Sequence, residues 1–483
     1  MGLLSALGLS RKRTGEAKPR LVRARYDAAL GAGGERHWAN ADALSADAAM
    51  DPRVRETLRN RSRYEVANNS YAAGIVRTLA DDTVGTGPRL QIQAGDRDAS
   101  AIVENAWHRW SSFVDLPGKL RTMRMSRARD GEVFAVLTSN PRVGQATGVS
   151  LDVQLIEADQ VYAPFGGDIQ PSDDQQNIDG VVIDRDGNPI AYTIAEVHPG
   201  ARDGLRSGLG RFRRLSRDVV LHYFRGERPG QHRGVPELTP ALPLFAQLRR
   251  YTLAVLGAAE TAASFAGILY TDAPAGGEAE AIEPLDPINL ERQALLTMPG
   301  GWRMEQLRAE QPSTGYGDFK HEILNEIARC LSMPFNVAAG NSSGYNYASG
   351  RLDHQTYHKA IGVERDVLGR TILDPILAAW RSEAVLLEDV IPPRLRSTPW
   401  GHSWMWPGHP HVDPNKEATA ASIRLEAGLT TLADEYASQG KDWEQQLRQR
   451  AREMELAAEL GLEMLGAAVA DAEDDEDDED DIA

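Results

Sequence analysis

The chain has 483 residues, 42% of them hydrophobic and 25% charged, and this length predicts a globular protein of roughly three domains at about 100–200 residues each. The formal net charge is −17, but ten acidic residues between Asp471 and Asp481 supply most of it, so the rest of the chain is only mildly acidic. The single cysteine, Cys330, excludes an intramolecular disulfide framework, and no apolar run reaches about 18 residues, so we expect neither a secreted nor a membrane-spanning protein.

The first half of the chain predicts helices followed by strands. Residues 1–40 are rich in arginine and lysine without a sustained period, which predicts a basic arm. Helical spacing over 52–82 and 101–114 flanks a short strand at 89–93. Four later segments alternate as strands, the third of them a hairpin that turns at 186–189: 132–139, 151–163, 180–197 and 218–224. This order predicts an α+β domain with a mostly antiparallel sheet.

The second half is mostly helical. An Ala- and Leu-rich run predicts one long helix over 244–271, and two short strands are expected around Pro299-Gly300-Gly301. Apolar residues then recur at helical spacing before Pro334 and again after Ser349, a plausible N-cap of a long helix that we expect to bend near Pro375. The recurring residues are Phe319, Ile323, Ile327 and Leu331, then Tyr357, Ile361, Leu368, Ile372 and Ile376.

The last part of the chain predicts further helix and a solvated end. Thr431 and Asp434 have the spacing of a capping box, and residues 441–465 are strong helix formers. The acidic run that follows is typical of a solvated tail, although it could also bind a basic partner or mimic a nucleic acid.

The segment from Pro334 to Gly350, PFNVAAGNSSGYNYASG, stands out between two helical patterns. Its glycine, asparagine, serine and tyrosine residues cannot bury a core, and it contains neither lysine nor arginine. We therefore expect an uncharged loop with a function of its own.

Two patterns in the sequence suggest chemistry. Gly340, Ser342 and Gly344 match the G-x-S-x-G turn of serine hydrolases, but such a turn needs a buried strand before it, and here a helix and a proline precede. His402, His409, His411 and Asp413 could present imidazoles to a metal, but a Pro/Trp-rich packing loop explains them as well, so no metal is expected.

Nucleotide chemistry is not expected either. A phosphate-binding loop has the pattern G-x-x-x-x-G-K-[ST], and the Gly118-Lys119 pair is followed by leucine. Cys330 is expected to be a small core residue. The sequence thus predicts no cofactor and no enzyme activity, with a serine hydrolase using Ser342 as the alternative.

The chain resembles the lambda-type portal proteins of tailed phages and prophages in ordered blocks over most of its length. The blocks are RNRSRYEVANNSYAAGIVRTLADDTVGTG from Arg59, RDGEVFAVL from Arg129, IEADQV from Ile156, GNPIAYTI from Gly187, HYFRGERPGQHRGVPEL from His222, YNYASGRLD from Tyr345 and HVDPNKEATAASIRLEAGLTTLADEYASQGKDWEQQ from His411. None of them is a catalytic signature.

The resemblance implies a portal-type, multi-domain ring subunit with a mixed α/β wing, a two-helix stem, a small α/β clip and a helical crown. The implied division is 1–40 basic arm, 41–240 wing, 241–271 first stem helix, 272–316 clip, 317–333 second stem helix, 334–350 tunnel loop, 351–411 wing helix and return segment, 412–466 crown and 467–483 disordered acidic tail.

The resemblance also implies a role and partners. A ring, commonly a dodecamer, would lie at one capsid vertex of the virion after assembly in the host cytoplasm, and double-stranded DNA would pass through it without sequence specificity. The terminase large subunit, the major capsid protein and head-tail joining proteins would bind it. Residues expected to line the DNA channel are Asn341, Ser342, Ser343, Tyr345 and Asn346, and basic residues of the stem are Arg249, Arg250 and Lys320.

Overall fold

The computed structural model describes residues 41–164, 174–201, 211–263, 267–271, 302–306, 315–344, 346–397, 399–408 and 414–462. The basic arm, the acidic tail, the turn at 299–301, Tyr345, His409, His411 and Asp413 therefore lie outside the described residues. None of the helices within these ranges combines the length and apolar character needed to cross a membrane.

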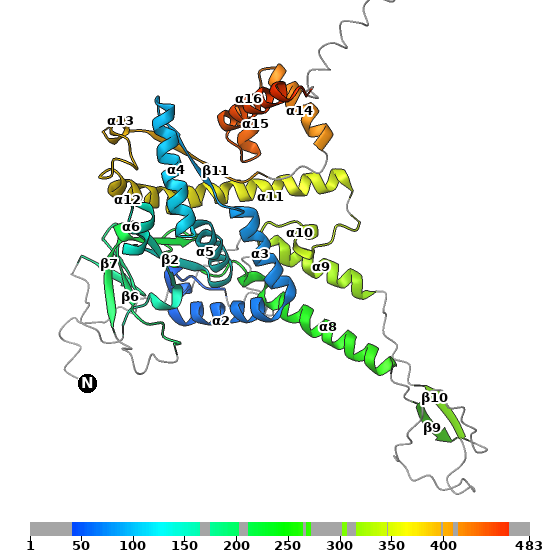
Figure 1. Ribbon diagram of the computed structural model, residues 1–483. Helices are drawn as coiled ribbons and strands as arrows, with labels where there is room; N and C mark the ends of the chain where they lie inside the picture. The colour runs from blue at the N-terminus through cyan, green and yellow to red at the C-terminus, as the bar shows by residue number, and fades with distance from the viewer. Residues whose placement is uncertain are drawn as a thin grey trace, which may run out of the picture. The chain divides into compact units, whose positions relative to one another are not determined.

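The N-terminal helices begin where polar side chains cap them (Figure 1). Asp51 accepts hydrogen bonds from the amides of Arg53 and Val54 at the start of α2, and Asn69 caps α3 in the same way. The helices of this part are α1 Ala46–Ala49, α2 Pro52–Asn68, α3 Ser70–Val84, α4 Arg97–Phe113, α5 Leu116–Asp130 and α6 Pro141–Thr147. Of these, α1, α5 and α6 were not predicted.

The strands of this part form two antiparallel sheets, one ordered β3-β2-β8 and the other β4-β5-β6-β7. Their bounds are β2 Glu132–Ser139, β3 Leu151–Glu157, β4 Gln176–Ile178, β5 Val181–Ile183, β6 Pro189–Ala195, β7 Phe212–Ser216 and β8 Val220–Phe224. The α+β class and the hairpin between β5 and β6 are confirmed, whereas the edge strands β4 and β7 were missed. A third pairing joins β1 Arg89–Gln93 to β11 Gly401–Met405, which are far apart in the sequence.

The long helix predicted from 241 to 271 is shorter in the structure. Helix α8 spans Leu242–Ala263, and Gly267–Thr271 is instead strand β9, paired antiparallel with β10 Trp302–Gln306. The prediction was wrong because Ile268, Tyr270 and Thr271 favour a strand once a partner strand is present, and an alanine-rich run before them does not reveal that partner.

Helices dominate the rest of the described chain. They are α9 Gly315–Arg329, α10 Phe335–Ala339, α11 Tyr347–Leu368, a π-helical segment Gly369–Leu373, α12 Asp374–Ala384, α13 Pro393–Arg396, α14 Pro414–Glu426, α15 Leu432–Ser438 and α16 Trp443–Leu460. The π-helical segment separates α11 from α12 and ends two residues before Pro375, while the bend expected near this proline stays a prediction. The predicted Thr431 cap is confirmed, since its hydroxyl accepts from the Asp434 amide at 3.1 Å.

Three apolar clusters among the described residues hold together the α+β part and the helices from α8 to α12. Trp107, Trp110 and Trp380 centre the first, which joins α4 and α5 to the β2 sheet, α12 and β11. The second packs α3, α8, α9, α10 and α11 around Phe245, and the third lies between the two sheets around Phe134. The predicted stripe of α11 and the following segment, from Tyr357 to Ile376, is buried throughout.

Candidate functional site in the segment between α9 and α11

The segment predicted as one loop from 334 to 350 is partly helical. Pro334 precedes the short helix α10, and α11 already begins at Tyr347. The loop prediction failed at these ends because Phe335 and Ala338 are buried against the second cluster, which gives a short apolar turn a reason to fold. Only residues 340–346, called the polar loop below, connect the two helices.

The described residues of the polar loop are exposed and uncharged. Gly340 and Gly344 have φ values of 62° and 87°, which side chains other than glycine rarely adopt. The Asn341 amide donates to the Asn336 carbonyl at 3.1 Å, and the Asn341 side chain accepts from the Ser343 amide at 2.9 Å. The loop thus has a local fold while the Ser342 and Ser343 side chains face outward.

Asn346, rather than Ser349, caps α11. Its side-chain oxygen accepts from the Ser349 amide at 2.8 Å, so the sequence prediction placed the cap three residues too late. Of the five residues expected to line a channel, Asn341, Ser342 and Ser343 are exposed in the loop, Asn346 is exposed and caps the helix, and Tyr345 is outside the described residues.

The structure contradicts the geometry required for a serine nucleophile at Ser342. Helix α10, not a strand, precedes the turn. The nearest histidine along the chain, His354, pairs with the Asn336 amide group at 3.0 Å. Ser342 therefore lacks the strand-to-helix setting of the nucleophile turn.

The helix after the polar loop is anchored by buried polar contacts. The Tyr357 hydroxyl donates to Asp82 at 2.8 Å, and burial raises the pKa of this tyrosine. Arg365 donates to the carbonyl oxygens of Thr83 and Asp82, both at 2.9 Å. These contacts fix α11 to the end of α3, so the polar loop is exposed on a firmly held frame.

The three basic residues proposed for the stem differ in their surroundings. Arg249 lies 5.8 Å from the centre of the Tyr64 ring, and Lys320 lies 5.0 Å from that of Tyr71, whose hydroxyl raises the lysine pKa. Arg250 is exposed. Helices α8 and α9, which carry them, contact each other through Thr252 and Tyr316 at 3.2 Å (Figure 1).

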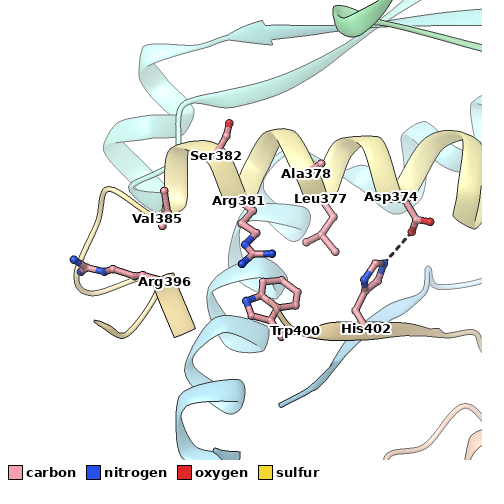
Figure 2. A pocket seen from close by; sticks show the side chains of 9 residues that line it. All are labelled: Asp374, Leu377, Ala378, Arg381, Ser382, Val385, Arg396, Trp400 and His402. Carbon is pink, nitrogen blue, oxygen red and sulfur yellow. Dashed lines mark hydrogen bonds and ion pairs between the residues drawn. The ribbon is translucent and has the colours of Figure 1, made fainter. Parts of the chain in front are cut away.

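Aromatic residues on one face of β11 meet charged residues of the helices opposite. His402 and the Trp404 indole contact the same Asp374 oxygen at 3.0 and 2.7 Å, and Arg381 lies 4.5 Å from the centre of the Trp400 ring. Figure 2 shows Asp374, Arg381, Trp400 and His402 among the side chains that line a pocket of about 560 Å³. His402 thus pairs with a carboxylate of α12, and the other three members of the suggested metal set lie outside the described residues.

A buried ionic cluster beneath the sheets was not predicted. Glu132 and Arg233 are 101 positions apart, both almost fully buried, and paired at 2.6 Å. His222 contacts the same carboxylate at 3.0 Å, and Arg55 approaches it at 3.5 Å while also pairing with Asp179. The RDGE and HRGVPE sequences that carry this cluster were recognised only as parts of a resemblance, since charge in a sequence does not show which residues will be buried together.

A neighbouring group combines Glu157, Asp159 and His198, whose ligand atoms lie within 4.8 Å of one another. Arg63 pairs with both carboxylates, at 3.2 and 2.7 Å. Because Arg63 and Arg59, which pairs with Asp159 at 3.2 Å, already supply positive charge to these carboxylates, the group is better explained as an ion-pair network than as a metal site.

The family described as "Phage portal protein, lambda family" matches residues 33–365, and the chain belongs to that family. Portal proteins are structural components of the virion that connect head and tail.

Individual relatives carry the same designation. The chain is 26% identical over 437 residues to a probable portal protein of Halomonas phage phiHAP-1, covering 84% of this chain and 82% of the relative. It is 25% identical over 474 residues to the portal protein of Escherichia phage N15, covering 88% of each. Among solved structures, a chain in the neck of an empty GTA particle overlaps 81% of this chain and 94% of its own length, with 14% identity and a TM-score of 0.44.

Proposed function

We propose that twelve copies of this chain form a ring at one vertex of a phage-type capsid, through which double-stranded DNA is packaged and later ejected. The observation that carries the proposal is the polar loop, exposed and uncharged on a firmly anchored frame, in a member of the portal family. The ring assembles in the host cytoplasm and remains in the virion.

Each part of the fold is assigned to one domain of the portal subunit. Helices α8 and α9 form the stem, and the β9–β10 pair belongs to the clip that faces the terminase large subunit and later the head-tail joining proteins. The α+β part and α11 form the wing beside the major capsid protein, and α14 to α16 form the crown.

An uncharged loop suits a channel through which DNA moves. Duplex DNA carries one charge per about 1.7 Å of axis, and each contact with a basic side chain releases counterions and strengthens the grip. The polar loop contains no lysine or arginine, whereas its asparagine and serine side chains form only sequence-independent hydrogen bonds with phosphates. DNA can therefore slide past many copies of the loop without being held.

No chemical step is assigned to the chain itself. Translocation requires an energy source, and the sequence has no phosphate-binding loop, so the terminase supplies ATP hydrolysis. The serine-hydrolase alternative has no support from either the geometry at Ser342 or the relatives.

Two experiments test the proposal. Negative-stain microscopy of the purified protein should show rings with a central hole, and finding only monomers or dimers across salt and protein concentrations would overturn it. Deleting residues 341–346 should leave rings intact while reducing DNA packaging or retention. If the deletion abolishes ring assembly instead, the loop is a packing element between subunits.

A further inference from the structure

The helical unit α14–α16 has almost no core of its own. Among the described residues from Asn415 to Leu462, Ala457 is the one buried side chain. Large apolar side chains are instead exposed: Ile423, Leu429, Leu432, Leu447, Met454, Leu456, Leu460 and Leu462. Because helices in proteins depend on packing an apolar face, this unit requires a partner that covers these residues.

Polar contacts join α14 to α15 and cap α16. Arg424 of α14 pairs with Glu417 at 3.0 Å and with Glu435 of α15 at 2.9 Å. Asp442 caps α16 by accepting from the amides of Glu444 and Gln445. Such exposed ion pairs and caps contribute little compared with a core, typically about 0–1 kcal/mol for a surface pair.

The exposed apolar residues of α16 form two stripes on opposite flanks. Leu447 and Met454 are seven residues apart, which is close to two turns at about 3.6 residues per turn, so they share one flank. Leu456 and Leu460 are four apart and share another. Leu447 and Leu456 differ by nine residues, or about two and a half turns, which places the two stripes on opposite sides of the helix.

Two different apolar flanks on one helix favour a head-to-tail contact between copies of the chain. A two-fold dimer uses the same patch on both subunits and leaves a second patch uncovered, whereas a ring uses two different patches on every subunit. The charges of α16 are also segregated, with Arg448, Arg450 and Arg452 preceding Glu453, Glu455 and Glu459, all exposed. Each copy therefore offers both signs of charge to its neighbours.

We propose that α16 packs between the α16 helices of two neighbouring copies, its Leu447–Met454 flank against the Leu456–Leu460 flank of one neighbour and its own Leu456–Leu460 flank against the Leu447–Met454 flank of the other. The occupant on both sides is a second copy of this chain. The proposal rests on the ring described under "Proposed function" and adds the residues through which its C-terminal unit is closed.

The test compares two paired variants of the full chain with the wild type by mass photometry over a dilution series. Leu447→Ser with Met454→Ser, and separately Leu456→Ser with Leu460→Ser, should each raise the protein concentration needed for rings at least tenfold. Leu386→Ser is the control, because this leucine is 79% exposed but lies outside the unit, and it should leave ring assembly unchanged. Circular dichroism verifies that each variant remains helical.

Mixing the two paired variants gives a second, independent readout. Each variant keeps one intact flank, so the mixture should form heterodimers that neither variant forms alone. Dimers from one variant alone would indicate a two-fold contact and overturn the head-to-tail arrangement.

Crosslinking covers the case in which the serine variants unfold. In a Cys330→Ala background, Leu447→Cys combined with Leu456→Cys should give a ladder of bis-maleimide products up to ring size, and either cysteine alone should not. If the wild type forms rings, the serine variants form them equally well and the crosslinking gives no ladder, this inference is wrong while the proposed function stands. A wild type that never forms rings would overturn the proposed function.

Discussion

Arg233 and Glu132 form a salt bridge at 2.6 Å in the interior of the α+β part, with side chains 3% and 0% exposed. Burial alone would raise the pKa of the Glu132 carboxyl, but the charge of Arg233 and the hydrogen bond from His222 outweigh it and hold the pKa well below its usual range. The backbone amide of Gly234, the next residue after Arg233, also donates a hydrogen bond to this carboxylate at 2.9 Å. A single carboxylate therefore ties the start of β2 to the segment before α8.

Replacing Arg233 by methionine should destabilise the protein strongly. The substitution keeps much of the side-chain volume but leaves the Glu132 charge without its main partner, a loss of about 3–5 kcal/mol for a broken buried pair. Urea unfolding followed by circular dichroism measures the change. Arg370→Met is the matched control, because Arg370 and its partner Asp366 are 67% and 66% exposed, and it should cost less than about 1 kcal/mol. Equal effects of the two substitutions would contradict a stabilising role of the buried pair.

Stability should fall as the pH drops below neutral. Burial lowers the pKa of His222, which is stacked between Phe134 and Phe224 at 4.1 and 4.4 Å. A group with a lowered folded-state pKa stabilises the fold above its ordinary value, about 6.5 for histidine, and this stability is lost as the pH falls. Glu132, whose pKa is also lowered, adds a further loss of stability below about pH 4.3, the ordinary pKa of glutamate.

The pH dependence can be assigned with one variant. His222→Phe keeps an aromatic ring in the stack and removes the titrating group, so its melting temperature relative to its own value at pH 8 should fall less between pH 7 and 5 than that of the wild type. Identical slopes would show that His222 is not responsible.

Gly131 and Gly234 should tolerate no side chain, because the two turns that carry them touch. A Cβ atom on Gly234 would lie 2.2 Å from the Gly131 carbonyl oxygen, and one on Gly131 would lie 2.5 Å from the Val235 backbone. Gly234→Ala should therefore cost about 1–3 kcal/mol or more from overpacking. Gly226→Ala is the control, since nothing lies within 4 Å of its added Cβ, and its melting temperature should match the wild type.

The features that could be predicted from the sequence are those determined by residues close together along the chain. The apolar stripe from Tyr357 to Ile376, the Thr431 cap and the hairpin between β5 and β6 are confirmed, since each is encoded within a few turns or strands. Predictions failed where a distant partner decides the structure. Strand β9 needs β10, and α10 needs the core around Phe335.

The same reasoning applies to the candidate site. The exposed, uncharged character of Asn341, Ser342 and Ser343 could be predicted because composition alone indicates it. The buried cluster around Glu132 could not, because its paired members are far apart in the sequence, by 101 residues for Glu132 and Arg233 and by 124 for Arg55 and Asp179. An RDGE sequence gives no sign of which arginine will reach its glutamate.

Adding one positive charge to the polar loop should slow DNA passage in a salt-dependent way. In Ser342→Arg, each copy in a ring gains a guanidinium on an exposed position where the wild type has none. Every phosphate contact that forms adds about 0.9 to the steepness with which the logarithm of the DNA-binding constant falls with the logarithm of salt concentration. Several copies can contact one duplex, so their contributions add. Packaging into proheads with terminase should be slower than wild type at low salt and approach the wild-type rate as salt rises.

Ser342→Gln separates this effect from the size of the new side chain. Glutamine is long and polar but uncharged, so this variant should package DNA at the wild-type rate at every salt concentration, and both variants should form normal rings. If Ser342→Arg packages as fast as Ser342→Gln at low salt, Ser342 does not face the DNA and the polar loop does not line the channel. If both variants package DNA slowly at every salt concentration, the size of the new side chain obstructs a packed contact between subunits. The absence of charge in the loop would then not explain how DNA passes.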